Sequence, residues 1–568
     1  MKNILVPSLI TLAVSGQLYA NEYTPQINSE RPNIVIIIAE DMSSRIGAFG
    51  DEIATTPNLD ALAKESVRFN QVYTMAGVSA PSRAGLITGA PQHKTGLQHM
   101  RTSKMKYAGV PPSYVKAYPE LLRKNGYFTY NDIKTDYQFV NGAFDTGPFT
   151  IWDANGSAKN FNDFLVPSAW RQHDLQNKPF YINLNPMITH ESGLFTPERT
   201  PEKFRAMQQL VEKIRAQYTY KTPDSSKIEL PKYLVDSQQT RDEIARFYEN
   251  IQIMDTQIGN VISDLKEDGL WDNTIFIFTT DHGDCLPRSK REGFVSGTHV
   301  PMIMHVPDKY KPDWMPENGE EVDRLVSFED LAPTVLGYAG VESLPYMNGI
   351  DLSDDNPKER EYAFSDRARM DLADLRSYFV KDNDFQYVRN FSHNPNGATV
   401  EFRDYLSSVD DLNQGHKNGT LTADQEIWFT AKPDEELYDL NADPEQLNNL
   451  ASDPKYKETL DRFRNVMDEW RNIGSDTNLI DEKTLIADLS SPDGTQKTTL
   501  PPVAELDKVT GKIFLTPRTG GASIGYSYDN KTWHVYNRSF LPNQSEKKLY
   551  IKAVRYGWKE SEAVEFLL

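Results

Sequence analysis

Three apolar segments of this chain each run into acidic or histidine side chains, and this repetition constrains the fold more than any other feature. The segments are residues 33–38, 179–185 and 274–279, and the polar side chains that follow them are Glu40, Asp41, His190, Asp281 and His282. Continuous apolar runs are typical of strands that are buried on both faces of a parallel sheet. Because ligands bind at the carboxyl ends of such strands, the pattern predicts an α/β fold with one site at that edge.

Helices are predicted between these strands. Thr56 and Pro57 are typical of a helix cap and first turn, and a second helix is expected to end near Gly126. Residues 241–265 repeat apolar side chains at helical spacing, which predicts a long amphipathic helix. Residues 196–237 are charged and contain several prolines, so we expect an insertion there. Alternating strands and helices favour a parallel α/β core.

Ser79 begins the most specific motif, Ser-Ala-Pro-Ser-Arg followed by Ala-Gly-Leu-Ile-Thr-Gly. Residues 82–88 are expected to start a helix, which would place Ser79 near a positive dipole end that favours anions. Arg83 adds a fixed cationic fork beside the hydroxyl. The alternative is a plain turn in which Ser82 caps the helix.

The motif resembles the signature of the type I sulfatases, which are formylglycine-dependent enzymes of the alkaline-phosphatase superfamily. In these enzymes a Cys or Ser at the first position is oxidised after translation, so the resemblance implies that Ser79 becomes 3-oxoalanine (formylglycine). An ordinary serine is a weak nucleophile unless a base activates it. A hydrated aldehyde offers two hydroxyls on one carbon, so that one attacks sulfur and the other later expels sulfate.

Glu40, Asp41, Asp281 and His282 form an oxygen-rich set of side chains. Hard cations such as calcium prefer this donor set to the softer sites that zinc selects. The resemblance implies that the four residues bind one Ca²⁺ ion, since the family has acidic pairs at the corresponding strand ends. This chain has Glu40 where aspartate is usual, so Glu40 is the least typical ligand.

Two further segments resemble family motifs that bring cations to the sulfate oxygens. Gly-Tyr-Phe-Thr at residues 126–129 precedes Lys134, which matches the family lysine that contacts formylglycine and sulfate. Lys290 matches the lysine that bridges the sulfate and the leaving oxygen. Asp136 stands where many members have a catalytic histidine, and its role stays open between orienting Lys134 and binding substrate. The Lys-Thr-Asp variant resembles the branch of heparan N-sulfoglucosamine sulfohydrolase and Ser-type bacterial polysaccharide sulfatases.

His190 matches the family histidine near the scissile ester oxygen, so either His190 or Lys290 is expected to protonate the departing alcohol. A role for His190 in capping the strand end is the alternative. His99 and Arg101 lie downstream of the nucleophile and are predicted, with Asp136, to contact the substrate. The predicted catalytic residues are Ser79, Arg83, Lys134, His190 and Lys290.

Residues 1–20 are typical of a secretory signal peptide, because Lys2 precedes an apolar segment and Ala20 offers a cleavage site. We therefore expect an exported protein, periplasmic or secreted, with no membrane span. The only cysteine is Cys285, so no intrachain disulfide can form and core burial must supply the stability. The net charge of −20 argues against a nucleic-acid partner and requires local cations around any anionic substrate.

The expected fold class is α/β: a large mixed, mostly parallel sheet sandwiched by helices, a small C-terminal antiparallel subdomain and an appended β-sandwich. The boundaries are residues 1–20 for the signal peptide, 21–375 for the catalytic domain, 376–480 for the C-terminal subdomain, 481–500 for a linker and 501–568 for a β domain. The last segment resembles a chitobiase-type C-terminal domain. Its aromatic side chains either stack on sugar rings or pack on the core.

The sequence thus predicts an exported sulfatase that hydrolyses sulfate esters on a sulfated polysaccharide or oligosaccharide, such as ulvan or a glycosaminoglycan. A Ser-type formylglycine-generating maturase is an implied partner. One alternative is a phosphodiesterase or phosphonate monoester hydrolase of the same superfamily, which commonly needs more metal ligands than this chain offers. The other is a non-catalytic carbohydrate-binding protein, against which the intact Arg83, Lys134 and Lys290 argue.

Overall fold

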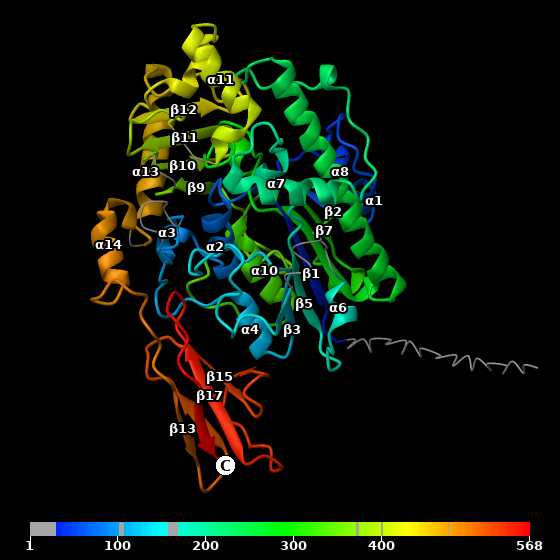
Figure 1. Cartoon of the computed structure of the whole chain (residues 1–568), viewed down its shortest axis with the longest axis vertical. Coiled ribbons are helices and arrows are strands. Elements are labelled where there is room, and N and C mark those ends of the chain that lie inside the picture. The colour runs from blue at the N-terminus through cyan, green and yellow to red at the C-terminus, as the bar shows by residue number, and fades with distance from the viewer. Residues whose placement is uncertain (1–29, 101–106, 157–167, 371–373, 399–401, 475) are drawn as a thin grey trace, which may run out of the picture.

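Eight strands of the described chain form one central sheet with the order β4-β3-β5-β1-β6-β7-β2-β8 (Figure 1). The computed structural model describes residues 30–100, 107–156, 168–370, 374–398, 402–474 and 476–568. The strands are β1 (Asn33–Ala39), β2 (Val67–Tyr73), β3 (Phe128–Asn131), β4 (Ala154–Asn155), β5 (Phe180–Leu184), β6 (Thr274–Thr280), β7 (His299–His305) and β8 (Glu321–Ser327). All neighbours pair in parallel except β7, which runs antiparallel to β6 and to β2. The predicted mixed, mostly parallel sheet is confirmed.

Helices pack on both faces of this sheet (Figure 1). The helices of the described chain are α1 (Pro57–Lys64), α2 (Ser79–Thr88), α3 (Gln92–Thr95), α4 (Tyr118–Lys124), α6 (Ala169–Gln172), α7 (Glu202–Arg215), α8 (Gln238–Glu267), α9 (Val295–Thr298), α10 (Leu331–Tyr338), α11 (Ser407–Asn418), α12 (Ala423–Glu426), α13 (Lys457–Arg471) and α14 (Glu482–Leu489). The long helix expected over residues 241–265 is α8, which begins earlier because Ser237 caps it by accepting from Thr240 N at 3.0 Å. The segment expected to be an insertion contains α7.

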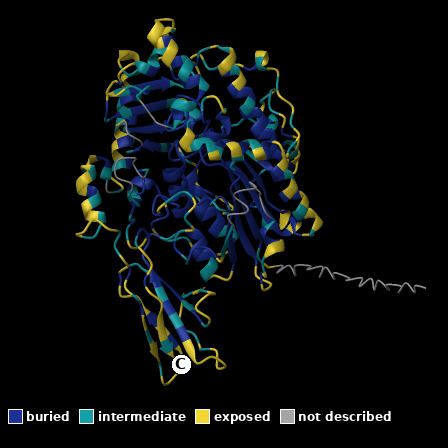
Figure 2. Ribbon diagram, viewed as in Figure 1, coloured by how far each residue is buried: buried dark blue, intermediate teal, exposed yellow. Residues whose placement is uncertain are grey.

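The position of strand β1 between two layers of helices explains why its sequence is continuously apolar. Val35 and Ile37 join a hydrophobic cluster with α1, α7 and α8, whereas Ile34, Ile36 and Ile38 join a second cluster with α2, α4 and α10. All five side chains are at most 1% exposed. The buried interior in Figure 2 therefore consists of two helix–sheet layers that share one sheet. This arrangement leaves the strand ends as the place where polar groups can gather.

A second sheet of four antiparallel strands adjoins the central one, with the order β12-β11-β10-β9. Its strands are β9 (Ala363–Arg367), β10 (Ser377–Lys381), β11 (Phe385–Asn390) and β12 (Glu435–Asp439). Helix α13 packs Phe463 and Met467 against Tyr378 and Tyr387 of this sheet. The sheet corresponds to the small antiparallel unit that the sequence predicts.

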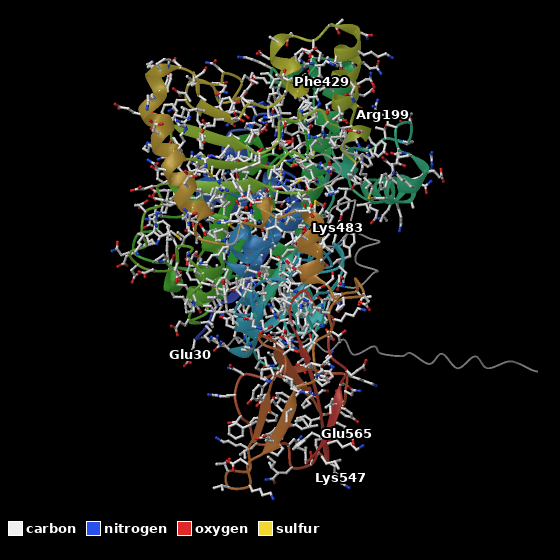
Figure 3. All side chains as sticks on the ribbon, turned by 90° about the vertical axis from the view of Figure 1, so that its left-hand side faces the viewer. Glu30, Arg199, Phe429, Lys483, Lys547 and Glu565 are labelled. Carbon is white, nitrogen blue, oxygen red and sulfur yellow. The ribbon has the colours of Figure 1, made fainter. Side chains whose placement is uncertain are left out.

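Two further antiparallel sheets form the C-terminal part of the chain. They contain β13 (Val503–Leu506) with β14 (Ile513–Thr516), and β15 (Ser523–Ser527), β16 (His534–Val535), β17 (Lys548–Val554) and β18 (Val564–Leu567) in the order β16-β15-β17-β18. Figures 1 and 3, which differ by a 90° rotation, both show these sheets extending from one end of the main body, and Figure 3 shows Lys547 and Glu565 towards the far end. The range expected to be a linker contains α14.

Glu120 joins the C-terminal sheets to the main body. Its buried carboxylate accepts hydrogen bonds from Ser523 Oγ at 2.6 Å and from the Tyr556 hydroxyl at 2.7 Å. Burial alone would raise the pKa of Glu120, but the ammonium groups of Lys124 and Lys116 lower it below its usual range. Because a buried charge needs such partners, this network ties the C-terminal sheets to α4 in a defined position.

Aromatic rings extend the contact between the C-terminal sheets and the main body towards the carboxyl ends of the central strands. Tyr556 stacks on Phe139 with ring centroids 5.0 Å apart, and Phe139 stacks on Tyr137 at 5.4 Å. Tyr137 directly follows Asp136, one of the predicted substrate-contacting residues. The C-terminal sheets therefore pack against the segment that carries part of the predicted site.

Within the described part of the chain, no helix combines the length and the apolar character needed to cross a membrane. The predicted signal peptide, residues 1–20, lies outside the described residues.

Candidate active site

The polar residues that follow β1 and β6 meet because these strands are neighbours in the sheet. The backbone N–H of Asp41 donates to Asp281 Oδ1 at 3.1 Å, and His282 Nε2 lies 3.0 Å from Asp41 Oδ1. Glu40, Asp41, Asp281 and His282 are all completely buried. Asp41 also has a φ of 50°, a left-handed conformation that is rare outside glycine. The predicted strand-end set therefore exists as one cluster of side chains.

Ser79 is the first residue of α2, with Val78 as its N-cap. Its hydroxyl lies 3.3 Å from His282 Nε2 and 3.3 Å from Lys134 Nζ. The helix begins three residues before the predicted start, so the alternative of a turn capped by Ser82 is wrong. Ser82 Oγ instead donates to the backbone oxygen of Asp281 at 2.5 Å. The hydroxyl of Ser79 thus stands at a helix N-terminus, where negative charge is favoured.

Gly77 allows the segment just before α2 to approach the segment that carries Lys290. The backbone N–H of Arg291 donates to Gly77 O at 2.6 Å. A Cβ atom at position 77 would come within 2.0 Å of the backbone oxygen of Glu292. Only glycine fits here, and the close approach brings two sequence-distant motifs to one site.

Arg83 links three elements of the cluster. Its guanidinium donates to Asp281 Oδ2 at 3.0 Å, to Asn185 Oδ1 at 2.6 Å and to Glu40. Arg83 is 2% exposed. Burial alone would lower the pKa of Arg83, but Glu40 and Asp281 raise it, so the group stays cationic. Arg83 is therefore a fixed positive charge beside Ser79.

Lys134 connects Ser79 to the acidic residues. Besides the contact with Ser79, its ammonium pairs with Glu40 and lies 3.6 Å from Asp136 Oδ2. Ile133 and Asp136 have φ values of 51° and 46°. A β-branched residue in this region is strained, and such strain concentrates at functional sites. The segment between β3 and the following loop is thus held in an unusual conformation that directs Lys134 inward.

His190 and Lys290 lie together on the other side of Asp41. Lys290 Nζ is 2.5 Å from Asp41 Oδ2, 3.1 Å from Glu191 Oε1 and 3.4 Å from His190 Nε2. Burial, together with the charge of Lys290, lowers the pKa of His190 to about 4. Burial alone would lower the pKa of Lys290, but Asp41 and Glu191 raise it above its usual range. At neutral pH, Lys290 therefore carries a proton to donate and His190 does not.

Asp41, Asp281 and His282 are suited to hold a metal ion. One ligand atom from each lies within 4.8 Å of the others, and Glu40, Asp41 and His190 form an overlapping group of the same kind. Asp41 Oδ1 is buried and accepts no hydrogen bond of ordinary geometry. His282 Nδ1 faces Gly283 O at 3.0 Å, which directs Nε2 to the carboxylates, as is usual for metal-binding histidines. These residues fit a hard divalent cation.

The other predicted substrate residues lie elsewhere. His99 is 1% exposed, and its ring nitrogens contact Thr477 Oγ1 at 3.0 Å and the backbone N–H of Arg369 at 3.2 Å. Burial, with the nearby Arg369 charge, lowers the pKa of His99 to about 3. Neither of these partners belongs to the group around Ser79, so the contact of His99 with substrate stays a prediction. Arg101 lies outside the described residues.

Two site residues, Asn185 and Glu191, are absent from the sequence-based prediction. Glu191 forms ion pairs with Lys290 and, through both oxygens, with Arg291, and its backbone N–H donates to Asp41 Oδ2 at 2.7 Å. Asn185 directly follows β5 and binds Arg83. The strand-end rule that finds His190 applies equally to Asn185 and Glu191, so the signal was present in the sequence.

A comparison with known protein families accounts for this geometry. The sequence profile named Sulfatase matches residues 32–341. An ulvan-active sulfatase of Formosa agariphila is 35% identical over 94% of this chain and 91% of its own length. The chain belongs to the sulfatase family. It is therefore a sulfuric ester hydrolase, and the sequence-based prediction of the family is confirmed.

More distant relatives of this sulfatase support the same assignment. The human N-sulphoglucosamine sulphohydrolase is 25% identical, with 77% of this chain and 89% of the human protein covered. Among solved structures, a 2-O GAG sulfatase superposes with a TM-score of 0.56 at 21% identity, covering 79% of this chain and 93% of that chain. The structural likeness shows that the sulfatase has the alkaline-phosphatase type of fold. Sulfatases generally use a formylglycine and a metal ion, and the acidic cluster beside Ser79 offers residues suited to such an ion.

Proposed function

We propose that this sulfatase is exported and removes sulfate from a sulfated polysaccharide or oligosaccharide, with Ser79 converted to formylglycine and one calcium ion bound beside it. The observation that carries the proposal is the position of the Ser79 hydroxyl. It lies 3.3 Å from Lys134 Nζ and 3.3 Å from His282 Nε2, at the start of α2. An anion centred there is stabilised by the helix N-terminus and by buried cations.

The formal charges of the cluster support one divalent cation together with one sulfate ester. The carboxylates are Glu40, Asp41, Asp136, Glu191 and Asp281, and the cations are Arg83, Lys134, Lys290 and Arg291. Five negative and four positive charges leave −1, and adding +2 for the metal and −1 for the sulfate monoester gives zero. Because buried net charge is unfavourable, the loaded site is the better-balanced state.

The aldehyde explains how the enzyme can turn over without a second water attack. An unmodified Ser79, activated by His282, would end as a sulfate ester on the chain that water must then hydrolyse. A hydrated aldehyde at position 79 would supply one hydroxyl to attack sulfur as the bond to the sugar oxygen breaks, and deprotonation of the other hydroxyl would expel sulfate and restore the aldehyde. Arg83 and Lys134 hold the sulfate oxygens as charge develops, and a Ca²⁺ ion held by Asp41, Asp281, His282 and Glu40 would polarise one of those oxygens. Serine conversion implies a Ser-type maturase in the producing cell.

Lys290 is the proposed donor of the proton to the departing sugar hydroxyl. Its ammonium is fixed by Asp41 and Glu191, whereas the low pKa of His190 leaves that imidazole neutral at neutral pH. His190 Nε2 lies 3.4 Å from Lys290 Nζ, so the imidazole is placed to accept a hydrogen bond from the ammonium and to orient it. Of the two proton donors that the sequence leaves open, this division of roles favours Lys290 over His190.

The substrate class follows from the relatives. The bacterial relative at 35% identity is ulvan-active, and the human relative is an N-sulphoglucosamine sulphohydrolase. Both names specify a sulfated carbohydrate, and an exported enzyme meets such polymers outside the cytoplasm. We therefore propose ulvan fragments first, and glycosaminoglycan fragments second, as substrates.

Sulfate release from defined ulvan and glycosaminoglycan oligosaccharides tests this proposal directly. The same preparation is digested, and the peptide that contains residue 79 is weighed by mass spectrometry. Conversion of the serine alcohol to the aldehyde lowers the peptide mass by about 2 mass units. Sulfate release by protein that carries only an unmodified serine would reject the formylglycine, and no release from any oligosaccharide by modified protein would reject the substrate class.

Removal of the metal is expected to lower the rate of sulfate release by at least about 100-fold, because several kcal/mol of charge stabilisation are lost. Chelation should also lower the melting temperature, since an ion at 100 times its Kd stabilises the folded state by about 2.7 kcal/mol. Activity and thermal unfolding are measured with EDTA and after Ca²⁺ or Mg²⁺ is restored. The Asp41→Asn variant should show no Ca²⁺-dependent change in melting temperature. An unchanged melting temperature in wild-type protein on chelation would contradict the calcium site.

A further inference from the structure

A pocket of about 440 Å³ lies where the C-terminal sheets meet the main body. Phe128, Phe149 and Lys178 line it from the main body, and Lys531 and Trp533 line it from the C-terminal sheets. None of the residues of the proposed active site is among those that line it. Phe128 begins β3, whereas Lys134 follows the end of the same strand, so the pocket and the catalytic cluster lie towards opposite ends of β3. The volume is in the range typical of small-molecule sites.

The two walls of this junction pocket are fixed relative to one another. Arg123 donates to Asp153 Oδ1 at 2.7 Å, to Phe149 O at 2.7 Å and to Trp533 O at 2.5 Å. The rings of Phe149 and Trp533 meet edge to face, with centroids 5.6 Å apart. Lys552 Nζ lies 3.9 Å from the centroid of Phe149 and 4.6 Å from that of Trp533. A ligand therefore meets a preorganised surface and orders little of the chain on binding.

The charges around the junction pocket favour an anion. Its lining contains the cations Arg123, Lys178 and Lys531 and the carboxylates Asp153 and Asp174, a formal sum of +1 on a chain whose net charge is −20. Among the described residues, neither Lys178 nor Lys531 has an ion-pair partner, and both are exposed. Their ammonium groups are thus available to a ligand that carries sulfate or carboxylate groups.

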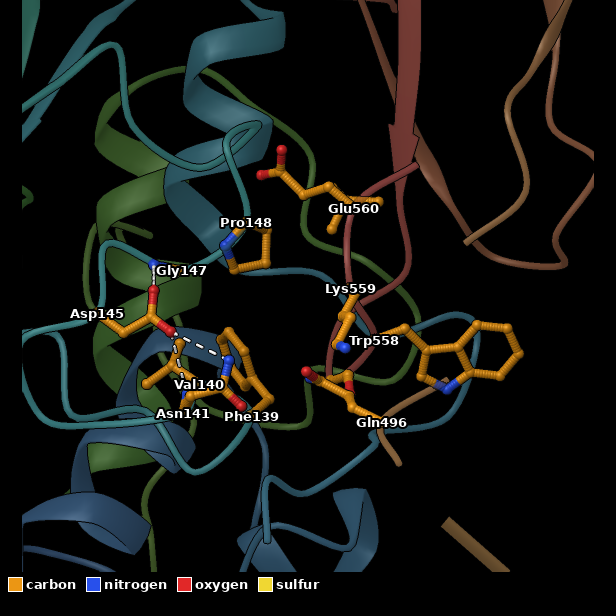
Figure 4. A pocket seen from close by; sticks show the side chains of 12 residues that line it. Phe139, Val140, Asn141, Asp145, Gly147, Pro148, Gln496, Trp558, Lys559 and Glu560 are labelled. Atoms are coloured by element: carbon orange, nitrogen blue, oxygen red, sulfur yellow. Dashed lines mark hydrogen bonds between the residues drawn. The ribbon is translucent and has the colours of Figure 1, made fainter. Parts of the chain in front are cut away.

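A second pocket at the same junction provides a contrast. It has about 210 Å³ and is lined by Pro148, Trp558 and Lys559, with Asp145 and Glu560 nearby in its lining (Figure 4). One cation against two carboxylates gives a formal sum of −1, so this pocket repels anions although it also offers a tryptophan. Among the described residues, both pockets offer a partly exposed tryptophan and a lysine without an ion-pair partner, but cations outnumber carboxylates only in the lining of the larger one.

We propose that the junction pocket binds an anionic sugar unit of the polymer at a site separate from Ser79. The apolar face of a sugar ring packs on Trp533, as amphipathic ligands do on aromatic side chains, while Lys178 and Lys531 pair with its sulfate or carboxylate. The identity of the ligand rests on the proposed function, because that function supplies the sulfated carbohydrate. The site holds long chains on the enzyme and leaves short substrates unaffected.

Binding is tested with full-length protein in a Ser79→Ala background, so that no turnover alters the polymer. Affinity electrophoresis through gels that contain ulvan, heparin or desulfated ulvan gives the dissociation constants. We expect Trp533→Ala and the double variant Lys178→Gln/Lys531→Gln each to weaken binding to a sulfated polymer about tenfold, an effect that corresponds to about 1.4 kcal/mol. Matched controls are Trp558→Ala in the acidic pocket and Lys508→Gln/Lys512→Gln on exposed positions of the C-terminal sheets, which should bind as the parent does.

The same changes in the catalytically intact background should leave hydrolysis of 4-nitrophenyl sulfate unchanged and raise KM for the polymer. Unaltered binding by the double lysine variant would overturn the proposal, as would an equal loss of affinity in the control variants. The lysine variant keeps this test valid if Trp533→Ala lowers the melting temperature. Pocket-dependent binding without any sulfate release would reject the proposed function but support the binding site. Sulfate release without pocket-dependent binding would support the proposed function but reject the binding site.

Discussion

Ser79→Ala is expected to lower the rate of sulfate release by at least about 10⁴-fold, because the change removes the group that becomes the nucleophile. The fold should survive, since among the described residues the Ser79 hydroxyl lies within hydrogen-bond range of only the His282 and Lys134 side chains, and removing one oxygen creates no large cavity. The measurements are kcat/KM on an aryl sulfate and on a sulfated oligosaccharide, with the melting temperature as a check on folding.

Ser44→Ala is the matched control for this loss. Ser44 Oγ is buried and has no hydrogen-bond partner within the described part of the chain, so its deletion should change kcat/KM by less than about twofold. Ser79→Cys provides a second comparison, because the family motif accepts either residue at this position. Retention of more than about a tenth of the activity by Ser79→Ala would show that another group attacks sulfur, and His282 would then need a different role.

The strand ends could be predicted because a buried parallel strand leaves a simple pattern. Ile34 to Ile38 contact helices on both faces of the sheet, so the run contains no polar residue until the strand ends at Ala39. Polar residues that follow the strand therefore lie at the sheet edge that it shares with the neighbouring strands. For the same reason Asp41 and Asp281 could be paired from the sequence before the order of strands was known.

The residues that sequence analysis missed act through partners that no local pattern reveals. Glu191 follows His190 directly, yet its importance comes from Lys290 and Arg291, which are 99 and 100 positions away in the numbering. The start of α2 at Ser79 was likewise hidden. Pro81 is compatible with the first turn of a helix, and the preceding Val78 is an atypical N-cap that tertiary contacts must support. The junction pocket depends on docking between two parts of the chain, which the composition of either part does not encode.

Lys290→Ala should reduce kcat/KM far more on a sulfated oligosaccharide than on an aryl sulfate. A general acid contributes about 10²–10⁴-fold when the leaving group is a poor one, as a sugar alkoxide is. A nitrophenolate departs without a proton, so the aryl substrate should lose only the electrostatic contribution of the ammonium. The ratio of the two losses, measured at neutral pH, is expected to be at least about tenfold.

Two comparison variants separate proton donation from charge and from stability. Lys290→Arg keeps the positive charge between Asp41 and Glu191 but does not release its proton, so it should recover the aryl substrate and not the oligosaccharide. His190→Ala should show the same substrate selectivity as Lys290→Ala but with a smaller loss, because His190 is neutral and acts by orienting Lys290. Equal losses on both substrates for Lys290→Ala, together with selective loss of the oligosaccharide for His190→Ala, would assign the proton to His190. That result would mean that bound sulfate raises the pKa of His190 from about 4 into the neutral range.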